Sequence, residues 1–342
     1  MTGERRTARR ALRWGVALSL LVLLSACARN APQDALEPAG PYARQIDTLF
    51  NWVFWTAAGV FFLVEGLLVY AAVRFRHRPG RPTPVQVHGN PRLEIAWTIA
   101  PAALLAAIAV PTILLTFSLS RRPADALDIE VVAHQFWWEV RYPNEQVVTA
   151  NEVHIPVGRP VFVRLTSVDV IHSFWIPRLA GKQDVRPGAV THLTLQAEEP
   201  GTYLGQCAEY CGLSHANMRL RVVAQPPDQF RAWVDQQRAP VVAQPSEAAM
   251  AALQRGGCAG CHTLNGVEGF GAPSVQTSTV GPDLTHVGSR QTLAGATLEN
   301  TPEQLAAWLR DPQAMKPGND MVIPKLTEQE VEALVAYLES LK

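Results

Sequence analysis

The chain has 342 residues, with 30 Lys plus Arg balanced by 30 Asp plus Glu, so its formal net charge is zero. A balanced charge gives no basis for nucleic-acid binding, and the length is sufficient for two or three domains. Hydrophobic residues make up 48% of the chain and are clustered in a few runs rather than spread evenly.

Residues 1–27 have the pattern of an export signal. Five Arg residues accompany an apolar core that runs from Ala11 to Leu24, which is typical of a signal peptide. The sequence L-S-A-C that ends at Cys27 resembles a bacterial lipoprotein cleavage box, and it favours a lipid on Cys27. Ordinary cleavage after Ala28, at a small-x-small site, is the alternative.

Two apolar runs, Trp52–Val73 and Ile95–Phe117, follow the signal. Each is long enough to cross a bilayer core of roughly 30 Å. Residues 74–92 between them hold five Arg and no acidic residue, so the positive-inside rule puts this loop in the cytoplasm. We predict a transmembrane helix hairpin over residues 46–120, with everything after it outside the cytoplasm.

Two acidic residues lie in or beside these spans. Glu65 falls in the middle of the first span, where an ionisable group is either functional or is protonated or paired against a partner subunit. Glu94 begins the second span, where a carboxylate also interacts favourably with the helix dipole.

Residues 124–225 change to short β-branched runs separated by turn signals. Such runs predict a β-sandwich or barrel, with strands at Ile129–Ala133, Val161–Leu165, Val190–Leu195 and Leu220–Val223. The sequence H-Q-F-W-W over residues 134–138 adds an aromatic cluster, which we expect in the first strand.

A dense set of metal-binding side chains follows, in the sequence C-A-E-Y-C-G-L-S-H-A-N-M over residues 207–218. Two thiolates, an imidazole and a thioether suit copper better than other common metals, and two Cys in one loop can bridge two metal ions. A disulfide and a zinc site are the alternatives. His172 lies 35 residues before the first Cys and is a candidate second imidazole.

The last segment begins with a Pro- and Gln-rich linker at residues 226–246, which has room for one short helix. Cys258-Ala259-Gly260-Cys261-His262 is the attachment motif for a covalent c-type haem. Its sixth ligand should be a Met, because Met/His ligation raises the haem potential, and Met315 and Met321 are the candidates. Apolar spacing predicts a terminal helix over 327–341.

The motifs D-V-I-H-S-F-W-I-P and C-A-E-Y-C-G-L-S-H-A-N-M together resemble subunit II of haem–copper cytochrome c oxidases. The resemblance implies a cupredoxin-like Greek-key barrel and a dinuclear copper centre. It also implies that the Glu209 side chain reaches a magnesium ion at the interface with subunit I. The implied copper ligands are Cys207, Cys211, His172, His215, Met218 and the backbone carbonyl of Glu209.

The resemblance extends to two further stretches. In E-I-A-W-T-I-A-P, Glu94 would mark the cytoplasmic mouth of a proton pathway into subunit I. The cluster H-Q-F-W-W resembles the patch where cytochrome c delivers electrons, which makes Trp137 and Trp138 candidates for that step. Phe136 stands where the family often has Trp, and a tethered haem that supplies the electrons would account for this departure.

Residues 247–342 resemble a small, all-α class I cytochrome c. The sequence P-G-N-D-M makes Met321 the implied sixth haem ligand. The resemblance also implies that the Pro282 carbonyl orients His262, that Arg290 lies beside the haem propionates and that Trp308 lies against the haem.

The combined expectation is subunit II of a respiratory cytochrome c oxidase of the bacterial inner membrane, with a fused cytochrome c. Its partners would be subunit I, subunit III and a c-type cytochrome or other electron donor. Nitrous oxide reductase is one rival, but it needs a separate multi-histidine copper cluster and the chain has only nine His. A membrane-anchored electron carrier without an oxidase partner is the other.

Overall fold

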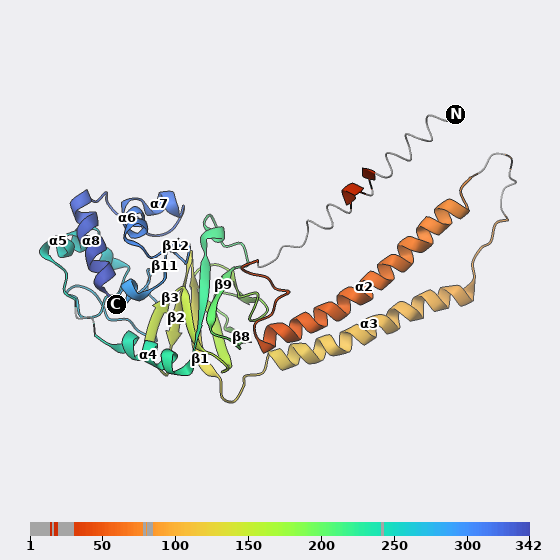
Figure 1. Cartoon of the computed structure of the whole chain (residues 1–342), viewed down its shortest axis with the longest axis horizontal. Coiled ribbons are helices and arrows are strands. Elements are labelled where there is room, and N and C mark those ends of the chain that lie inside the picture. The colour runs from red at the N-terminus through yellow and green to blue at the C-terminus, as the bar shows by residue number, and fades with distance from the viewer. Residues whose placement is uncertain (1–13, 16, 20–30, 78–79, 81–84, 241–242) are drawn as a thin grey trace.

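The computed structural model describes residues 14–15, 17–19, 31–77, 80, 85–240 and 243–342. The predicted lipid-bearing Cys27 lies outside these residues. Figure 1 shows three parts in a row: a long helical hairpin, a β-domain, and a C-terminal domain on the far side of the β-domain from the hairpin.

The hairpin consists of α2 (Pro41–Arg74) and α3 (Pro91–Leu119), and both helices are long and apolar enough to cross a membrane. Both begin with Pro at the first turn, a position that has no need of a backbone N–H donor. The Asn90 side chain caps α3 by accepting hydrogen bonds from the amides of Arg92 and Leu93. The predicted pair of spans is therefore present, and each helix extends beyond its predicted apolar run.

The β-domain consists of two five-stranded sheets, ordered β3-β2-β1-β5-β8 and β4-β10-β9-β6-β7. The pairs β1–β5 and β4–β10 are parallel, whereas the other pairs are antiparallel. This arrangement is the predicted cupredoxin-like sandwich. The strands are β1 (Leu127–His134), β2 (Trp137–Tyr142), β3 (Val147–Ala150), β4 (Glu152–Pro156), β5 (Val161–Ser167), β6 (His172–Trp175), β7 (Gln183–Val185), β8 (Thr191–Leu195), β9 (Gly201–Cys207) and β10 (Arg219–Gln225).

All four predicted strand runs fall in or across strands of this domain, namely β1, β5, β8 and β10. The position of the aromatic cluster was wrong. It does not lie in one strand, because β1 ends at His134, β2 begins at Trp137, and Gln135 and Phe136 form the turn between them. The register that pairs His134 with Trp137 requires the chain to reverse at this point, although no Gly, Pro or Asn marks the turn.

The first half of the predicted linker is a helix, α4 (Pro227–Arg238), that packs on the β-domain. Phe230 and Val234 are buried in the same core as the sheets. Trp233 stacks on the ring of His154 in β4, with centroids 4.2 Å apart. The short apolar face of α4 therefore fastens the chain to the β-domain before it continues.

The C-terminal domain is a set of short helices around a separate apolar core. The N-cap of the last helix is Thr327, whose side chain and that of Glu330 form a reciprocal capping box. The elements of the C-terminal domain are α5 (Glu247–Arg255), η2 (Cys258–Gly260), η3 (Val287–Ser289), β11 (Thr292–Leu293), β12 (Leu298–Glu299), α6 (Pro302–Arg310), α7 (Pro312–Met315) and α8 (Glu328–Ser340). The strands β11 and β12 form a two-residue ladder. The predicted terminal helix corresponds to α8.

A hydrogen-bonded seam joins the C-terminal domain to the β-domain. The Arg219 amide donates to the Gly295 carbonyl at 2.9 Å, and the Thr297 hydroxyl donates to the Asn217 carbonyl at 2.8 Å. At another point of the seam, the Arg141 guanidinium donates to the Ser278 hydroxyl at 2.5 Å. These bonds connect backbone as well as side chains, so they fix the orientation of one domain on the other.

Glu152, at the start of β4, is the buried anion of this seam. Its carboxylate accepts hydrogen bonds from the Thr292 amide and hydroxyl, both at 2.7 Å, and from the Gln291 amide at 3.1 Å. Burial alone would raise the pKa of Glu152, but nearby His154 and the bonds from Thr292 and Gln291 outweigh burial and lower the pKa. Folding into the docked arrangement therefore favours the ionised carboxylate.

The depressed pKa predicts that domain docking weakens in acid. A carboxyl whose pKa is lower in the folded state stabilises that state fully above its ordinary value of 4.5 and loses the contribution as pH falls through the lower folded value. We expect the protection factor of the Thr292 amide, measured by hydrogen exchange and corrected for the intrinsic rate, to fall in that range.

Glu152→Gln should remove this pH dependence and weaken docking by about 1.5–3 kcal/mol, as expected for lost bonds to a charged group. Glu130→Gln is the matched control, because Glu130 pairs with Arg164 at the surface of the same domain. A parent chain whose Thr292 protection stays constant below pH 4.5 would contradict the assignment.

Candidate functional site

The predicted copper ligands converge at one end of the second sheet. His172 begins β6, Cys207 ends β9, and residues 208–218 form the loop that leads into β10. The Cys207 amide donates to the Met218 carbonyl at 2.9 Å, which closes the loop at its base. Since β6 and β9 are paired neighbours, the sheet brings the distant His172 to the loop.

Distances between the donor atoms are uniformly short. The two thiol sulfurs, of Cys207 and Cys211, lie 3.9 Å apart, which is well beyond the roughly 2.05 Å of a disulfide bond. The Cys207 sulfur lies 3.9 Å from His172 Nδ1, and the Cys211 sulfur lies 3.6 Å from His215 Nδ1. Met218 contributes its sulfur 3.8 Å from that of Cys211.

The sixth predicted ligand also lies here, because the Glu209 backbone carbonyl is 3.3 Å from the Cys207 sulfur. The Glu209 side chain itself is on the surface, where a partner subunit can reach it. His172, Cys207, Cys211 and Met218 are all buried. The arrangement thus pairs one imidazole with each thiol around a centre that is largely buried, with His215 on its more exposed side.

The second nitrogen of His172 has a fixed partner. Its Nε2 is 2.7 Å from the Asp169 carboxylate, so Nε2 carries the proton and Nδ1 faces Cys207 with its lone pair. Burial would lower the pKa of His172, but the Asp169 carboxylate outweighs burial and raises it. A carboxylate behind a ligating His is a recurrent means of orienting the ring and increasing its basicity.

The two thiols have opposite acidities. A hydrogen bond from Cys211 stabilises the Cys207 thiolate and lowers the pKa of Cys207. The Cys207 thiolate in turn raises the pKa of Cys211. Two thiolates this close repel each other unless cations lie between them. The donor set therefore fits soft metal ions that two sulfurs share, and copper is the common metal that suits it.

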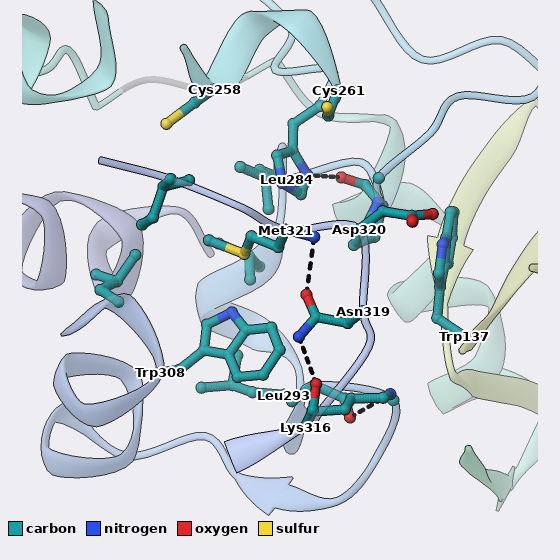
Figure 2. A pocket seen from close by; sticks show the side chains of 18 of the residues that line it. Trp137, Cys258, Cys261, Leu284, Leu293, Trp308, Lys316, Asn319, Asp320 and Met321 are labelled. Atoms are coloured by element: carbon teal, nitrogen blue, oxygen red, sulfur yellow. Dashed lines mark hydrogen bonds between the residues drawn. The ribbon is translucent and has the colours of Figure 1, made fainter. Parts of the chain in front are cut away.

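A second centre is the main cavity of the C-terminal domain, about 210 Å³ in volume. Every residue that the sequence assigned to haem lines it: Cys258, Cys261, His262, Pro282, Arg290, Trp308 and Met321. Figure 2 shows Met321 and Trp308 near one another in the cavity, with the two Cys sulfurs at one side of it. Met315, the other candidate ligand, ends α7 and is outside the described lining.

His262 is oriented by the backbone. Its Nδ1 donates to the Pro282 carbonyl at 2.7 Å, so Nε2 is the ring nitrogen that remains free to bind iron. Burial lowers the pKa of His262, and the neutral ring is the form that ligates a metal.

Arg290 lies on another wall of the same cavity. One guanidinium nitrogen donates to the Asp283 carbonyl at 2.5 Å, while its buried Nε has no partner among the described residues. An unpartnered buried donor in a mostly apolar cavity is suited to an anionic group such as a haem propionate. The residues present therefore fit a haem.

Trp137 and Trp138 lie between the two centres. They are consecutive in β2, so their side chains point to opposite faces of the sheet. Trp137 lines the haem cavity and donates to the Val280 carbonyl at 3.2 Å. Trp138 is fully buried and meets His172 edge-on, with ring centroids 5.9 Å apart.

Glu94 is in the first turn of α3, where its carboxylate accepts a hydrogen bond from the Asn90 amide at 3.2 Å. This contact caps the helix and leaves the side chain exposed. Glu65 is in α2 and lines a recess between the two helices with Leu104 and Ile108 of α3.

Sequence reasoning missed three charged residues near the centres: Glu152 and Lys316, which are buried, and Asp169, which is more exposed. Asp169 stands three residues before His172 in the quoted motif, so its spacing could have indicated a partner for that ring. Glu152 and Lys316 contact residues more than 100 positions away, and no local pattern indicates such contacts.

Comparison with known proteins agrees with this arrangement. Residues 30–115 and 144–225 match the transmembrane and periplasmic domains of cytochrome c oxidase subunit II, and residues 247–342 match cytochrome c. Cytochrome c oxidase subunit 2 of Alkalihalophilus pseudofirmus is 40% identical over 95% of this chain and 96% of its own length.

Two further relatives are more distant. Cytochrome c oxidase subunit 2 of Bacillus subtilis is 34% identical over 94% of this chain and 95% of its own. Quinol oxidase subunit 2 of Bacillus anthracis is 33% identical over 65% of this chain and 79% of its own. The chain belongs to the cytochrome c oxidase subunit II family and carries a C-terminal cytochrome c domain, which makes it a subunit of an oxidoreductase in the bacterial inner membrane.

Proposed function

We propose that the chain accepts electrons on a covalent haem c and passes them through a dinuclear copper centre to haem in subunit I. The observation that carries this proposal is that two consecutive residues of β2, Trp137 and Trp138, connect the two centres. Trp137 lines the haem cavity, and its neighbour Trp138 contacts His172 beside the two thiols. No bulk water separates the centres along this strand, since Trp137 and Trp138 are both buried.

The chain's own residues have distinct parts in this function. Cys258 and Cys261 would hold the haem covalently, with His262 and Met321 as its axial ligands. His172, His215, Cys207, Cys211, Met218 and the Glu209 carbonyl would hold the two copper ions. When bound, these groups supply one-electron redox chemistry, and the buried protein frame keeps their ligands in nearly the same positions in both redox states.

Oxygen reduction and proton pumping belong to the partner subunit in this proposal. Three of the nine His are ligands in this proposal: His262 would bind the haem, and His172 and His215 would bind copper. The other His form no second metal cluster among the described residues. Glu94 would deliver protons to subunit I, and Glu209 would bind magnesium where subunit I meets the copper loop. Subunit III would complete the complex.

The donor would be a basic protein. Residues 247–342 hold eleven acidic residues and six Lys plus Arg, so this domain attracts a positively charged cytochrome. The two rivals remain weaker. Nitrous oxide reductase needs many more His, and a simple electron carrier has no need of a second span or of Glu94. Co-purification with a large haem protein of many spans would distinguish a carrier from an oxidase subunit.

The copper assignment predicts a stoichiometry and a spectrum. The full-length chain, purified in detergent with haem and reconstituted with copper, should bind two copper ions per haem. Its electron paramagnetic resonance should show hyperfine structure shared over two copper nuclei, because two thiolates bridge them. Cys211→Ser removes one bridge and should abolish the shared hyperfine structure.

Cys258→Ser with Cys261→Ser is the matched control for the loss of thiols, since these changes should remove covalent haem and leave the copper signal intact. A single copper with localised hyperfine structure, or a disulfide between Cys207 and Cys211, would refute the dinuclear centre.

The choice between two methionines gives a second test. Met321→Ala should lower the haem reduction potential by on the order of 100 mV or more, since axial ligands set haem potentials over about 0.8 V. Met315→Ala should leave it unchanged, because Met315 ends α7 outside the described cavity lining. Redox titration of both variants checks the prediction, and the reverse result would assign the ligand to Met315.

A further inference from the structure

We propose that Lys316 is the positioning residue that locks the haem domain onto the copper domain for electron transfer between them. The proposal rests on the two centres assigned above and adds the device that holds them together. Lys316 follows α7 in the loop that leads to Met321, and it is 3% exposed although it carries an amine.

The amine bridges the two domains. Lys316 Nζ donates to the Phe136 carbonyl at 2.5 Å, in the β1–β2 turn, and to the Ala294 carbonyl at 2.9 Å, in its own domain. Gly295 makes room for it, because a Cβ there would stand 2.3 Å from Nζ and 2.8 Å from the Phe136 carbonyl oxygen. A side chain at position 295 would displace the amine from both acceptors.

A buried amine is unfavourable unless it has a specific partner. None of the ion pairs among the described residues includes Lys316, and burial lowers its pKa to about 7, although the nearby Cys211 acts in the opposite direction. The two carbonyl acceptors satisfy both N–H donors of the neutral amine and two of the three donors of the charged one. These two directional bonds, one to each domain, hold the amine in a defined orientation.

On the haem side, Lys316 is tied to the Met321 loop. The Asn319 side chain donates to the Lys316 carbonyl at 2.6 Å and accepts from the Met321 amide at 2.8 Å, as the dashed lines in Figure 2 show. These bonds use the Lys316 backbone carbonyl, so they hold the Met321 loop independently of the Lys316 amine.

On the copper side, both the β1–β2 turn and the Met321 loop contact the copper loop. Gln135, next to Phe136, donates its side-chain amide to the Cys211 carbonyl. The buried Ser214 hydroxyl donates to the Pro317 carbonyl at 2.6 Å, and Gly318 lies so close to Leu213 that a Cβ would stand 2.9 Å from it. Lys316 is thus at the point where the haem-ligand loop and the copper loop are joined.

The step that depends on this joint is a one-electron transfer. The haem iron is oxidised by one electron, the copper pair is reduced by one, and no bond forms or breaks. With Lys316 in place the domains stay docked, so the transfer needs no domain motion. Without it, transfer must wait for the haem domain to return to the copper domain.

Lys316→Met tests this in the full-length chain, since Met has similar length and no donor. Lys325→Met is the matched control, because Lys325 is exposed in the same domain. The first measurement is hydrogen exchange at the Arg219 amide, which donates to Gly295 across the seam. In copper-free protein we expect its exchange to quicken about tenfold in Lys316→Met, as for the loss of a buried hydrogen bond, and to be unchanged in Lys325→Met.

The second measurement is the rate of copper reduction after rapid photoreduction of the haem, at several solvent viscosities. We expect a slower, viscosity-dependent rate in Lys316→Met and a viscosity-independent rate in the parent and in Lys325→Met. Haem potential and copper spectrum should match the parent, which separates positioning from ligand loss.

Unchanged Arg219 exchange in Lys316→Met would overturn the proposal, and so would a transfer rate equal to that of the parent. The exchange measurement needs no copper. If the dinuclear centre itself were refuted, the exchange measurement would still decide whether Lys316 joins the domains, so the two failures are distinguishable.

Discussion

The close approach of two buried thiols, 3.9 Å apart, is the constraint on which the rest of this structure depends. Such a pair is unfavourable by itself, since one thiolate raises the pKa of the other. It persists only where the backbone on both sides is fixed. Cys207 is fixed because it is the last residue of β9, which pairs with β6 and β10. Cys211 is in a loop and needs other support.

That support comes from outside the loop. The side-chain amide of Gln135 donates a hydrogen bond to the Cys211 carbonyl. The Ser214 hydroxyl donates to the Pro317 carbonyl of the C-terminal domain. The copper loop is therefore clamped between the β1–β2 turn and the haem domain. A frame of this kind restricts ligand movement when charge changes, which favours rapid electron transfer. The membrane hairpin lies on the other side of the β-domain (Figure 1) and leaves this clamp undisturbed.

The sequence predicted which candidate ligands lie near one another, because side chains within one motif are brought together by local geometry. Cys207, Cys211 and His215 occupy one loop, and Cys258 and Cys261 occupy another, so spacing alone predicted their proximity. The strands β1, β5, β8 and β10 were predicted from short β-branched runs separated by turn signals, which are local features as well. The β1–β2 turn was not, because Gln135 and Phe136 are not turn-forming residues, and only the sheet register of His134 against Trp137 reveals it.

Contacts between domains were beyond sequence reasoning for a different physical reason. Lys316 and Glu152 are charged, and charged residues are ordinarily exposed. Their burial depends on how two independently folded surfaces meet, which no periodicity records. Asp169 is intermediate, since its spacing to His172 is local but its role depends on the strand that turns the ring toward Cys207.

Phe136 illustrates how docking of the C-terminal domain changes the side chain that a position requires. Its side chain is 4% exposed and lines the haem cavity, and its carbonyl accepts from Lys316. A soluble donor cannot touch this residue while the haem domain covers it. An aromatic surface contact for a passing cytochrome is therefore unnecessary at position 136, and a smaller ring that packs against the tethered domain suffices. The adjacent Trp137 lines the cavity, so in the proposed route a haem in the fused domain would replace a transient encounter with a permanent interface.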